Sequence, residues 1–353
     1  MNVIEMYSDN SSQDSGQGPS KNLVYLAKPV YGGWVTFTAH LSRKFGYPIH
    51  KVTKRSEKNT RPYGYGCSYQ NLSLGDVLLL PNILITAVDK HYWSLLQFFP
   101  KDTEIVIHDP TECKTSSKSK DGNPLVQDTS IGSHLLQNFN VITIRAAVQQ
   151  YLKDEHEISS VFKRHPFYNY ELSKGPGWSY PNVSVARIDF DKNTDILLKA
   201  NAQLMNKCKI KIKDVQPIYL FGAENRIYVH HMLKPLNISE YWKGKFPKEL
   251  EPSLDNKSIL RDAKYMVDMS TIKGDGGGTQ YTFLEAIHNN CVLVLNNEWI
   301  KKGDLFVSGT NCIGVSDETE LAGFLETGLS TETWSQLLAC SKDILADHTS
   351  VVW

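Results

Sequence analysis

Residues 183–222 read VSVARIDFDKNTDILLKANAQLMNKCKIKIKDVQPIYLFG, and their pattern indicates an α/β fold. A β-branched run at 183–190 is followed by a helical segment, TDILLKANAQLMNK, and by a second apolar run at 216–222. Short β-branched runs that alternate with helical segments are typical of βαβ units, in which helices cover a parallel sheet. The alternation continues with a strand and its lead-in at 261–270, a helix with the sequence TQYTFLEAIHNN, and a strand at 291–297.

The first half of the chain shows the same alternation. A helix over TFTAHLSRKFG is expected to end at Gly46, because glycine commonly terminates helices. A second helix, AAVQQYLKDEH, follows a β-branched run, and a third is expected around 88–98. The strands predicted for this half are NLVYLA (22–27), VLLL (77–80), TEIVIHD (103–109) and NVITI (140–144).

Residues 173–182, SKGPGWSYPN, interrupt the alternation with turn-forming glycine, proline and serine, and are the predicted linker. The predicted fold class is α/β, with two doubly wound Rossmann-like domains that face each other across a cleft. Ligands of such sheets bind outside the carboxyl ends of the strands. The predicted divisions are a disordered tail (1–20), an N-terminal domain (21–172), the linker (173–182) and a C-terminal domain (183–353), whose last helix can pack back on the N-terminal domain.

Composition narrows the class of protein. Hydrophobic residues make up 41% and charged residues 22%, which excludes a wholly disordered chain. The 38 basic residues balance 38 acidic ones, whereas a protein that coats nucleic acid through bulk charge is strongly basic. The polar N-terminus shows no signal peptide, the apolar stretch 77–88 is too short to span a bilayer, and the six cysteines are scattered. We therefore expect a soluble, cytoplasmic protein without an integral membrane segment.

A glycine-rich loop precedes the helix TQYTFLEAIHNN. It contains Gly276, Gly277 and Gly278, and the helix begins near Thr279. Consecutive glycines allow the backbone to approach a ligand closely, and the free N–H groups of a helix start favour an anion. Glu285 lies further along the helix, where it could reach a ligand's hydroxyl groups. The alternative is a flexible loop beside a solvated glutamate, and neither the P-loop nor the G-x-G-x-x-G pattern is present.

Arg187 and Lys192 follow the strand at 183–190 and open the next helix. Two cations at a strand's carboxyl end can hold a diphosphate, with arginine as a planar fork and lysine as a point charge. A solvated helix start is the alternative. Asp189 and Asp191 form an Asp-x-Asp pair that could bind a metal, but three-residue matches are common by chance, so no metal is predicted.

These motifs resemble the large family of retaining glycosyltransferases with the GT-B fold and a Glu-x7-Glu motif. The resemblance implies that Arg187 and Lys192 hold the diphosphate of a nucleotide-sugar donor and that Glu285 binds the ribose hydroxyls. Gly277, Gly278 and Thr279 would supply amides to the donor. The sequence departs from the family at the first glutamate of the motif, where Gly277 stands.

The first half resembles the same family more weakly. Gly32 and Gly33 follow the first strand, as does the family's glycine loop that approaches the donor. His108 and Asp109 end a strand where the family often places a histidine beside the transferred sugar. The resemblance therefore implies that His108, Asp109, Arg187 and Lys192 serve catalysis. The alternatives are a plain turn and a structural histidine.

A basic segment between Arg43 and Arg61 carries seven cations and one acid, and the polar stretch 111–133 shows no clear periodicity. Both belong to the half that binds acceptor in GT-B enzymes. A basic, arginine-containing loop after the second strand and the later His108-Asp109 also loosely resemble phage DNA α-glucosyltransferases, which leaves a viral or phage origin open. A solvated face is the alternative. The predicted acceptor-binding residues are Lys54, Arg55, Lys58 and Arg61.

The sequence thus predicts a retaining, metal-independent hexosyl- or pentosyltransferase without a cofactor, which uses a nucleoside diphosphate sugar as co-substrate. The expected acceptor is a glycan or glycoprotein. A hydroxymethylated DNA base is the first alternative, and a nucleotide-sugar epimerase or a non-catalytic nucleotide-sugar-binding protein is the second. The sequence does not determine the sugar, the nucleotide or the oligomeric state.

Overall fold

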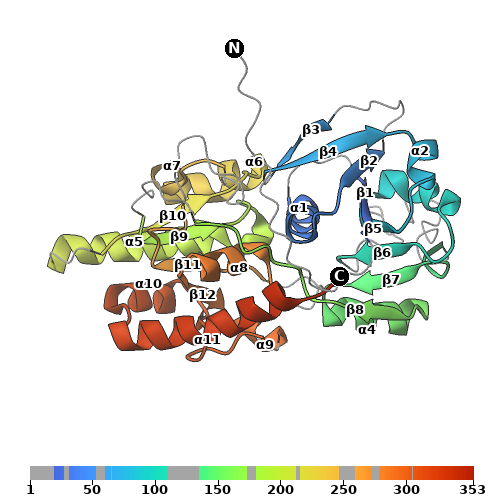
Figure 1. Cartoon of the computed structure of the whole chain (residues 1–353). Helices are drawn as coiled ribbons and strands as arrows, with labels where there is room; N and C mark the ends of the chain where they lie inside the picture. Colours follow the sequence, from blue (N-terminus) through green and yellow to red (C-terminus); the bar gives the residue numbers. More distant parts are fainter. Residues whose placement is uncertain are drawn as a thin grey trace, which may run out of the picture.

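The chain forms two lobes, each built on one β-sheet (Figure 1). The first lobe contains the strands between residues 22 and 162, and the second contains those between 182 and 315. The computed structural model describes residues 20–27, 32–52, 60–64, 66–109, 135–172, 180–211, 215–245, 259–271, 278–303 and 305–353.

The first sheet consists of β1 (Asn22–Leu26), β2 (Ile49–Val52), β3 (Thr60–Gly64), β4 (Cys67–Leu72), β5 (Ile83–Val88), β6 (Glu104–Ile107), β7 (Asn140–Thr143) and β8 (Ser160–Phe162). Their order across the sheet is β3-β4-β2-β1-β5-β6-β7-β8. Neighbouring strands pair in parallel, except that β3 is antiparallel to β4 at one edge. The chain order reverses at β1, which lies between β2 and β5.

The helices of the first lobe pack against this sheet. Helix α1 ends at Gly46, whose positive φ of 70° is readily adopted by glycine, and this confirms the predicted end. The helical elements are α1 (Gly33–Phe45), α2 (Leu74–Leu78), the 3-10 helix η1 (Lys90–Phe98) and α4 (Ala146–His156).

The second sheet consists of β9 (Asn182–Val185), β10 (Ile218–Phe221), β11 (Tyr265–Asp268), β12 (Val292–Asn296) and β13 (Ile313–Val315). These strands are all parallel, in the order β10-β9-β11-β12-β13. The order reverses between β9 and β11. In open parallel sheets this reversal is where ligands bind, at the carboxyl ends of the strands.

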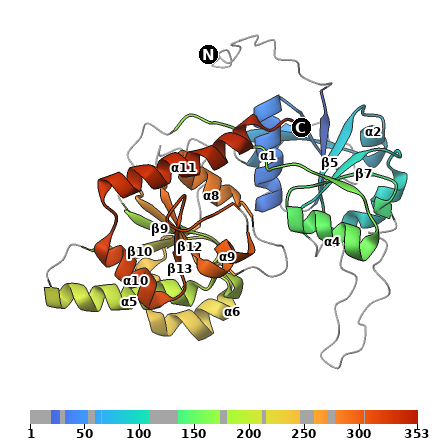
Figure 2. The ribbon, with the colours of Figure 1, turned by 90° about the horizontal axis from the view of Figure 1, so that it is seen from below.

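Helices also surround the second sheet, and its last helix crosses to the first lobe (Figures 1 and 2). These elements are η3 (Phe190–Lys192), α5 (Thr194–Lys211), α6 (Arg226–Tyr228), η4 (Val229–Leu233), η5 (Lys234–Leu236), α7 (Ile238–Tyr241), α8 (Tyr281–His288), α9 (Asn297–Lys302), α10 (Glu318–Thr327) and α11 (Thr331–Ser350).

Two predicted strands differ from the structure. Residues 77–80 do not form a strand: Val77 and Leu78 end helix α2, and the strand is β5 at Ile83–Val88. The helix forms because Ser73 and Asp76 make a capping box at its start. Strand β9 ends at Val185, earlier than predicted, so that Arg187 lies in the loop that follows it.

The junction between the lobes is a packed interface. Helix α1 contacts α8, where the rings of His40 and Tyr281 stack with centroids 4.4 Å apart. The C-terminal Trp353 reaches the first lobe, where its indole N–H donates to the carbonyl of Arg164 at 3.1 Å. None of the helices in the described ranges combines the length and apolarity that crossing a bilayer requires.

Candidate functional site

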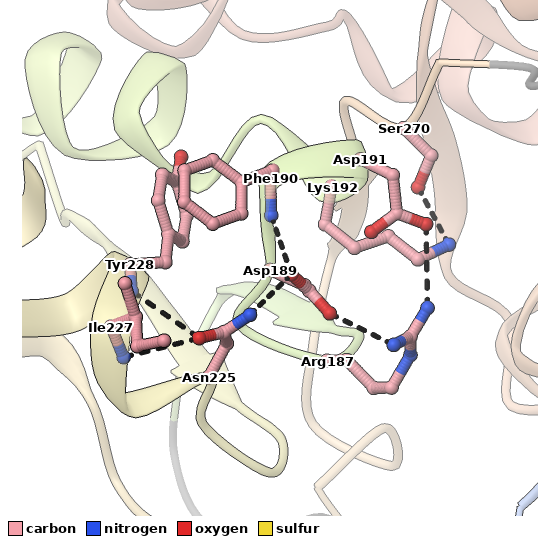
Figure 3. A network of polar contacts seen from close by, with 9 residues as sticks. All are labelled: Arg187, Asp189, Phe190, Asp191, Lys192, Asn225, Ile227, Tyr228 and Ser270. Atoms are coloured by element: carbon pink, nitrogen blue, oxygen red, sulfur yellow. Dashed lines mark hydrogen bonds and ion pairs between the residues drawn. The ribbon is translucent and has the colours of Figure 1, made fainter. Parts of the chain in front are cut away.

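Two loops meet at the point where the strand order of the second sheet reverses. One loop follows β9 and carries Arg187 and Lys192, and the other follows β11 and carries Ser270. Because β9 and β11 are paired in parallel, the loops lie side by side (Figure 3). We call residues 187–193 and 268–271 together the paired loops. The structure therefore brings both predicted diphosphate ligands to the edge where such a ligand is expected.

Arg187 is held by two carboxylates of its own loop. Its guanidinium contacts Asp189 at 2.9 Å and Asp191 at 3.3 Å, while its side chain stays 62% exposed (Figure 3). Ion pairs this exposed contribute little to stability. The pairs thus orient the fork of the guanidinium at the surface without burying it.

Lys192 links the two paired loops. Its ammonium donates to the hydroxyl of Ser270 at 2.9 Å, and the Asn193 side-chain amide donates to the Met269 carbonyl at 2.8 Å. The backbone N–H of Thr271 donates to the carbonyl of Asp191 at 3.1 Å. These three bonds fix the position of Lys192 relative to the end of β11.

Asp189 joins the β9 loop to the loop that follows β10. One of its carboxylate oxygens accepts from the Phe190 backbone N–H and from the Asn225 side-chain amide, both at 2.9 Å, while the other contacts Arg187. Both oxygens of the carboxylate are therefore engaged within the protein. Across the described ranges, no three histidine, cysteine or carboxylate side chains gather where they could hold a metal ion.

The glycine-rich loop is only partly described, and Gly277 lies outside the described residues. Gly278 has a positive φ of 92°, and its carbonyl accepts from the indole N–H of Trp299 at 3.1 Å. Thr279 is buried, with its hydroxyl 3.2 Å from Nε2 of His348. Helix α8 begins at Tyr281, two residues after the predicted start.

Glu285 lies in the second turn of α8 and is only 1% exposed. The alternative of a solvated glutamate is therefore wrong, because the side chain lies inside the lobe. Its nearness also raises the pKa of Tyr281, after the larger effect of burial. A role toward ribose remains a prediction for Glu285.

The glycine pair of the first lobe lies at the exposed N-terminus of α1. Gly32 caps the helix with a φ of 103°, a conformation that side chains disfavour, and Gly33 is the first helical residue. The Gly32 carbonyl accepts from the backbone N–H of Thr36 at 3.0 Å. The exposed N–H groups of such a helix start favour an anion.

His108 lies just after β6 and is buried against α1. Its Nε2 donates to the Thr86 carbonyl at 2.7 Å, and its ring meets Phe37 edge-on at 4.8 Å. Burial lowers the pKa of His108 to about 4, so the imidazole is neutral at pH 7. An imidazole with this pKa can form hydrogen bonds at pH 7 but carries no second proton to donate as a general acid. The neighbouring Asp109 is half-buried.

Of the predicted acceptor-binding residues, Arg61 alone lies in the described part of the chain. Lys54, Arg55 and Lys58 lie outside the described residues, as does the stretch 111–133. The backbone of Arg61 belongs to edge strand β3, opposite Tyr69 of β4. The basic segment is therefore not one continuous loop, because it includes the end of α1, all of β2 and part of β3.

Sequence reasoning missed two features. Ser270 and Asp268 belong to the paired loops, and the position of Asp268 at the end of an apolar run was the available signal. The second feature is a group of rings from distant segments at the lobe junction, all buried except the partly exposed His288. Its members are His40, His165, Phe167, Tyr281, His288 and His348.

No protein-family model matches the chain, and no curated protein matches its sequence. Solved structures do match it. Anabaena HepE in complex with UDP and glucose is 13% identical, with 94% of this chain and 96% of that chain covered and a TM-score of 0.61. An α-glucosyltransferase in complex with UDP is 11% identical, with coverage of 94% and 96% and a TM-score of 0.61. The protein has the GT-B fold.

The GT-B match includes both lobes. The same α-glucosyltransferase was also solved with UDP and a 13-mer DNA, at 12% identity, coverage of 95% and 96%, and a TM-score of 0.59. A glycosyltransferase from Rickettsia africae is 10% identical, with 95% of each chain covered and a TM-score of 0.53. The two-sheet arrangement is thus shared across nearly the full length of these chains.

Proposed function

We propose that the protein is a retaining glycosyltransferase that moves a sugar from a nucleoside diphosphate sugar to a hydroxyl group of a glycan or glycoprotein. The observation that carries the proposal is the position of Arg187 and Lys192 at the strand-order reversal of the second sheet, in a GT-B fold. Three of the four related structures are named as glycosyltransferases, and three hold UDP.

The proposed mechanism depends on charge neutralisation. As the sugar leaves, negative charge develops on the diphosphate, and preorganised cations stabilise that charge. Arg187 and Lys192 would supply the cations, and amides near Gly277, Gly278 and Thr279 would add hydrogen bonds. Glu285 would bind the ribose hydroxyls, and the amides at Gly32 and Gly33 would approach the donor from the first lobe.

His108 and Asp109 are proposed beside the transferred sugar. Since His108 is neutral at pH 7, it would hydrogen-bond to a sugar hydroxyl rather than act as a general acid. His108→Ala should then lower turnover more than donor affinity. An equal loss in both would indicate a uniform binding or structural role.

The proposal is tested by a thermal-shift screen of nucleoside diphosphate sugars, followed by product analysis. A ligand that binds only the folded state raises stability by mass action. UDP-glucose is the first probe, because UDP occupies related structures of this fold. Product formation with the donor's anomeric configuration is expected. Donor binding without transfer to any acceptor would instead favour a non-catalytic nucleotide-sugar-binding protein, and turnover without acceptor would favour an epimerase.

A hydroxymethylated DNA base is the second candidate acceptor. The α-glucosyltransferase solved with DNA has this fold, and the segment 43–61 concentrates positive charge in the first lobe. Replacing Lys54, Arg55 and Lys58 with Gln should then raise the KM for DNA and flatten its salt dependence, by roughly 0.7–0.9 in the log–log slope per lost phosphate contact. Equal salt dependence before and after the change would exclude these contacts.

A further inference from the structure

Asp268 is a buried carboxylate in the paired loops to which the proposed mechanism gives no role. It is the last residue of β11 and is 3% exposed. Its Oδ1 accepts from the backbone N–H of Ser270 at 2.8 Å, whereas Oδ2 has no hydrogen-bond partner within the described part of the chain. Burying a carboxylate that is only partly hydrogen-bonded costs free energy. The carboxylate thus indicates a function at the site rather than a contribution to stability.

Asp268 shares a small cavity with both proposed diphosphate ligands. Arg187, Lys192 and Asp268 all line this cavity, whose volume of about 10 Å³ admits about one water molecule. Asp268 is also connected to Lys192 through Ser270, whose N–H bonds the carboxylate and whose hydroxyl bonds the ammonium. Asp268 is therefore part of the diphosphate site.

Negative groups outnumber positive ones in the described paired loops. Arg187 and Lys192 provide two positive charges, and Asp189, Asp191 and Asp268 provide three negative charges. A site that only attracts phosphate would have an excess of cations, since phosphate affinity grows with opposite charge. This balance instead makes affinity sensitive to how many negative charges the ligand carries.

We propose, resting on the proposed function, that the carboxylate of Asp268 makes the site favour the sugar diphosphate over the free nucleoside diphosphate, and thereby promotes release of the product. Transfer breaks the bond between the anomeric carbon and the terminal phosphate oxygen, which keeps the bonding electrons. The acceptor oxygen forms the new bond to the anomeric carbon, and its proton passes to the leaving phosphate oxygen and from there largely to solvent at pH 7. The diphosphate changes from a diester with two negative charges to a product with close to three at pH 7, because the terminal phosphate has a second pKa near 6.

The test separates charge from sugar contacts by using UDP, UDP β-methyl ester and UDP-glucose as probes in calorimetry. The methyl ester has the charge of the donor but lacks the sugar. Asp268→Asn keeps the shape of the side chain and an oxygen for the Ser270 N–H. We expect this variant to bind UDP about tenfold more tightly relative to the methyl ester, the order of one charge interaction in a partly buried site. Product inhibition by UDP should increase in parallel.

Two further variants complete the design. Asp191→Asn removes a partly buried carboxylate that pairs with Arg187 and should shift the same ratio in the same direction, even if Asp268→Asn does not fold. Asp343→Asn, on the exposed surface of α11, is the matched control and should leave the ratio unchanged.

The outcomes distinguish this inference from the proposed function. If the wild-type protein binds none of the three probes, the proposed function is overturned. Wild type that binds them, with the ratio of UDP to methyl ester unchanged in Asp268→Asn and Asp191→Asn, would overturn this inference alone. A Mg²⁺-dependent gain in UDP affinity that disappears in Asp268→Asn would also overturn it, because the carboxylate would then be a metal ligand.

Discussion

Polar side chains are mostly exposed or partly exposed in the paired loops, whereas they are mostly buried at the lobe junction. The loop after β9, residues 187–193, keeps charged groups at or near the surface, where the Arg187 side chain is 62% exposed between two carboxylates. The junction buries neutral rings: His40 is fully buried, stacks on Tyr281 and accepts the backbone N–H of Tyr168 at 2.9 Å on its Nδ1. Exposed ion pairs add little stability, whereas buried aromatic contacts add much.

The difference in burial indicates different tasks for the two regions, stability for the lobe junction and ligand binding for the paired loops. Residues at the junction hold the lobes together, so their loss should lower stability. Arg187 and Lys192 in the paired loops are oriented at low energetic cost, so their loss should affect ligand binding and leave stability almost unchanged.

Phe167→Ala should give the largest effect on stability. The ring is 1% exposed and packs against His40 and His288 between the lobes. Removing a buried phenylalanine costs roughly 3–5 kcal/mol in the free energy of unfolding. Phe190→Ala in the paired loops is the control, since this ring is 49% exposed and its loss should cost about 1 kcal/mol or less. Equal losses in urea titrations would contradict the division.

His348→Gln should make stability less dependent on pH. Burial lowers the pKa of His348 to about 4, against about 6.5 in an unfolded chain. The unfolded state thus binds the proton first, and stability is lost as the pH falls from about 6.5 toward 4. Between pH 7 and pH 5, wild type should lose about 2 kcal/mol more than the variant.

Tyr281→Phe is the matched control for this pH dependence. It removes the hydroxyl that donates to the Pro166 carbonyl at 3.0 Å, so it should destabilise the junction by about 1 kcal/mol. A tyrosine does not titrate between pH 5 and pH 7, so the variant should keep the wild-type slope. A slope in His348→Gln equal to that of wild type would show that His348 takes up no extra proton on unfolding.

Glu285→Gln should weaken donor binding by about tenfold, the value of one hydrogen bond to a charged acceptor. A donor analogue without the 2′ and 3′ hydroxyls should lose affinity for wild type but lose less for the variant. The same loss against both proteins would show that Glu285 does not contact ribose and that its burial in α8 serves packing.

Chelation by EDTA should have the smallest effect, which is no change in activity. Asp189 and Asp191 already contact Arg187, and Asp189 also accepts from Asn225. Loss of activity that manganese restores would assign these carboxylates to a metal and contradict the ion-pair account of the paired loops.

The sequence predicted the two-lobed α/β fold because β-branched runs and helical segments alternate clearly in both halves. The strand predicted at 77–80 was wrong. The apolar run there is typical of a strand, but the capping box of Ser73 and Asp76 stabilises helix α2, which includes Val77 and Leu78. The position of Arg187 and Lys192 just after one strand could be predicted, because the two residues follow the apolar run of that strand closely in the sequence. The division of the chain into domains at 173–182 remains a prediction.

The lobe junction could not be predicted in the same way. Its rings come from α1, the segment 165–170, α8 and α11, which are far apart in the sequence, and no spacing rule joins them. The segment 165–168 is the exception: it lies just before the predicted linker, which favours packing at the domain junction, and the contacts of His165 with Phe37, Tyr281 and His348 confirm this. The role proposed for Asp268 could not be predicted, because burial and a carboxylate oxygen without a hydrogen-bond partner leave no signature in the sequence.

Arg187 and Lys192 are proposed to bind the diphosphate of a nucleotide sugar. This assignment is tested by calorimetry with UDP-glucose on wild type, Arg187→Ala and Lys192→Ala. Lys199→Ala is the control, because Lys199 is a cation outside the paired loops that pairs with Asp195, one turn before it in α5. Losing a charge-assisted hydrogen bond of about 1.5–3 kcal/mol predicts that each of the first two variants binds roughly 10- to 150-fold more weakly. The control should bind as wild type does. Unchanged affinity in both Arg187→Ala and Lys192→Ala would contradict the account.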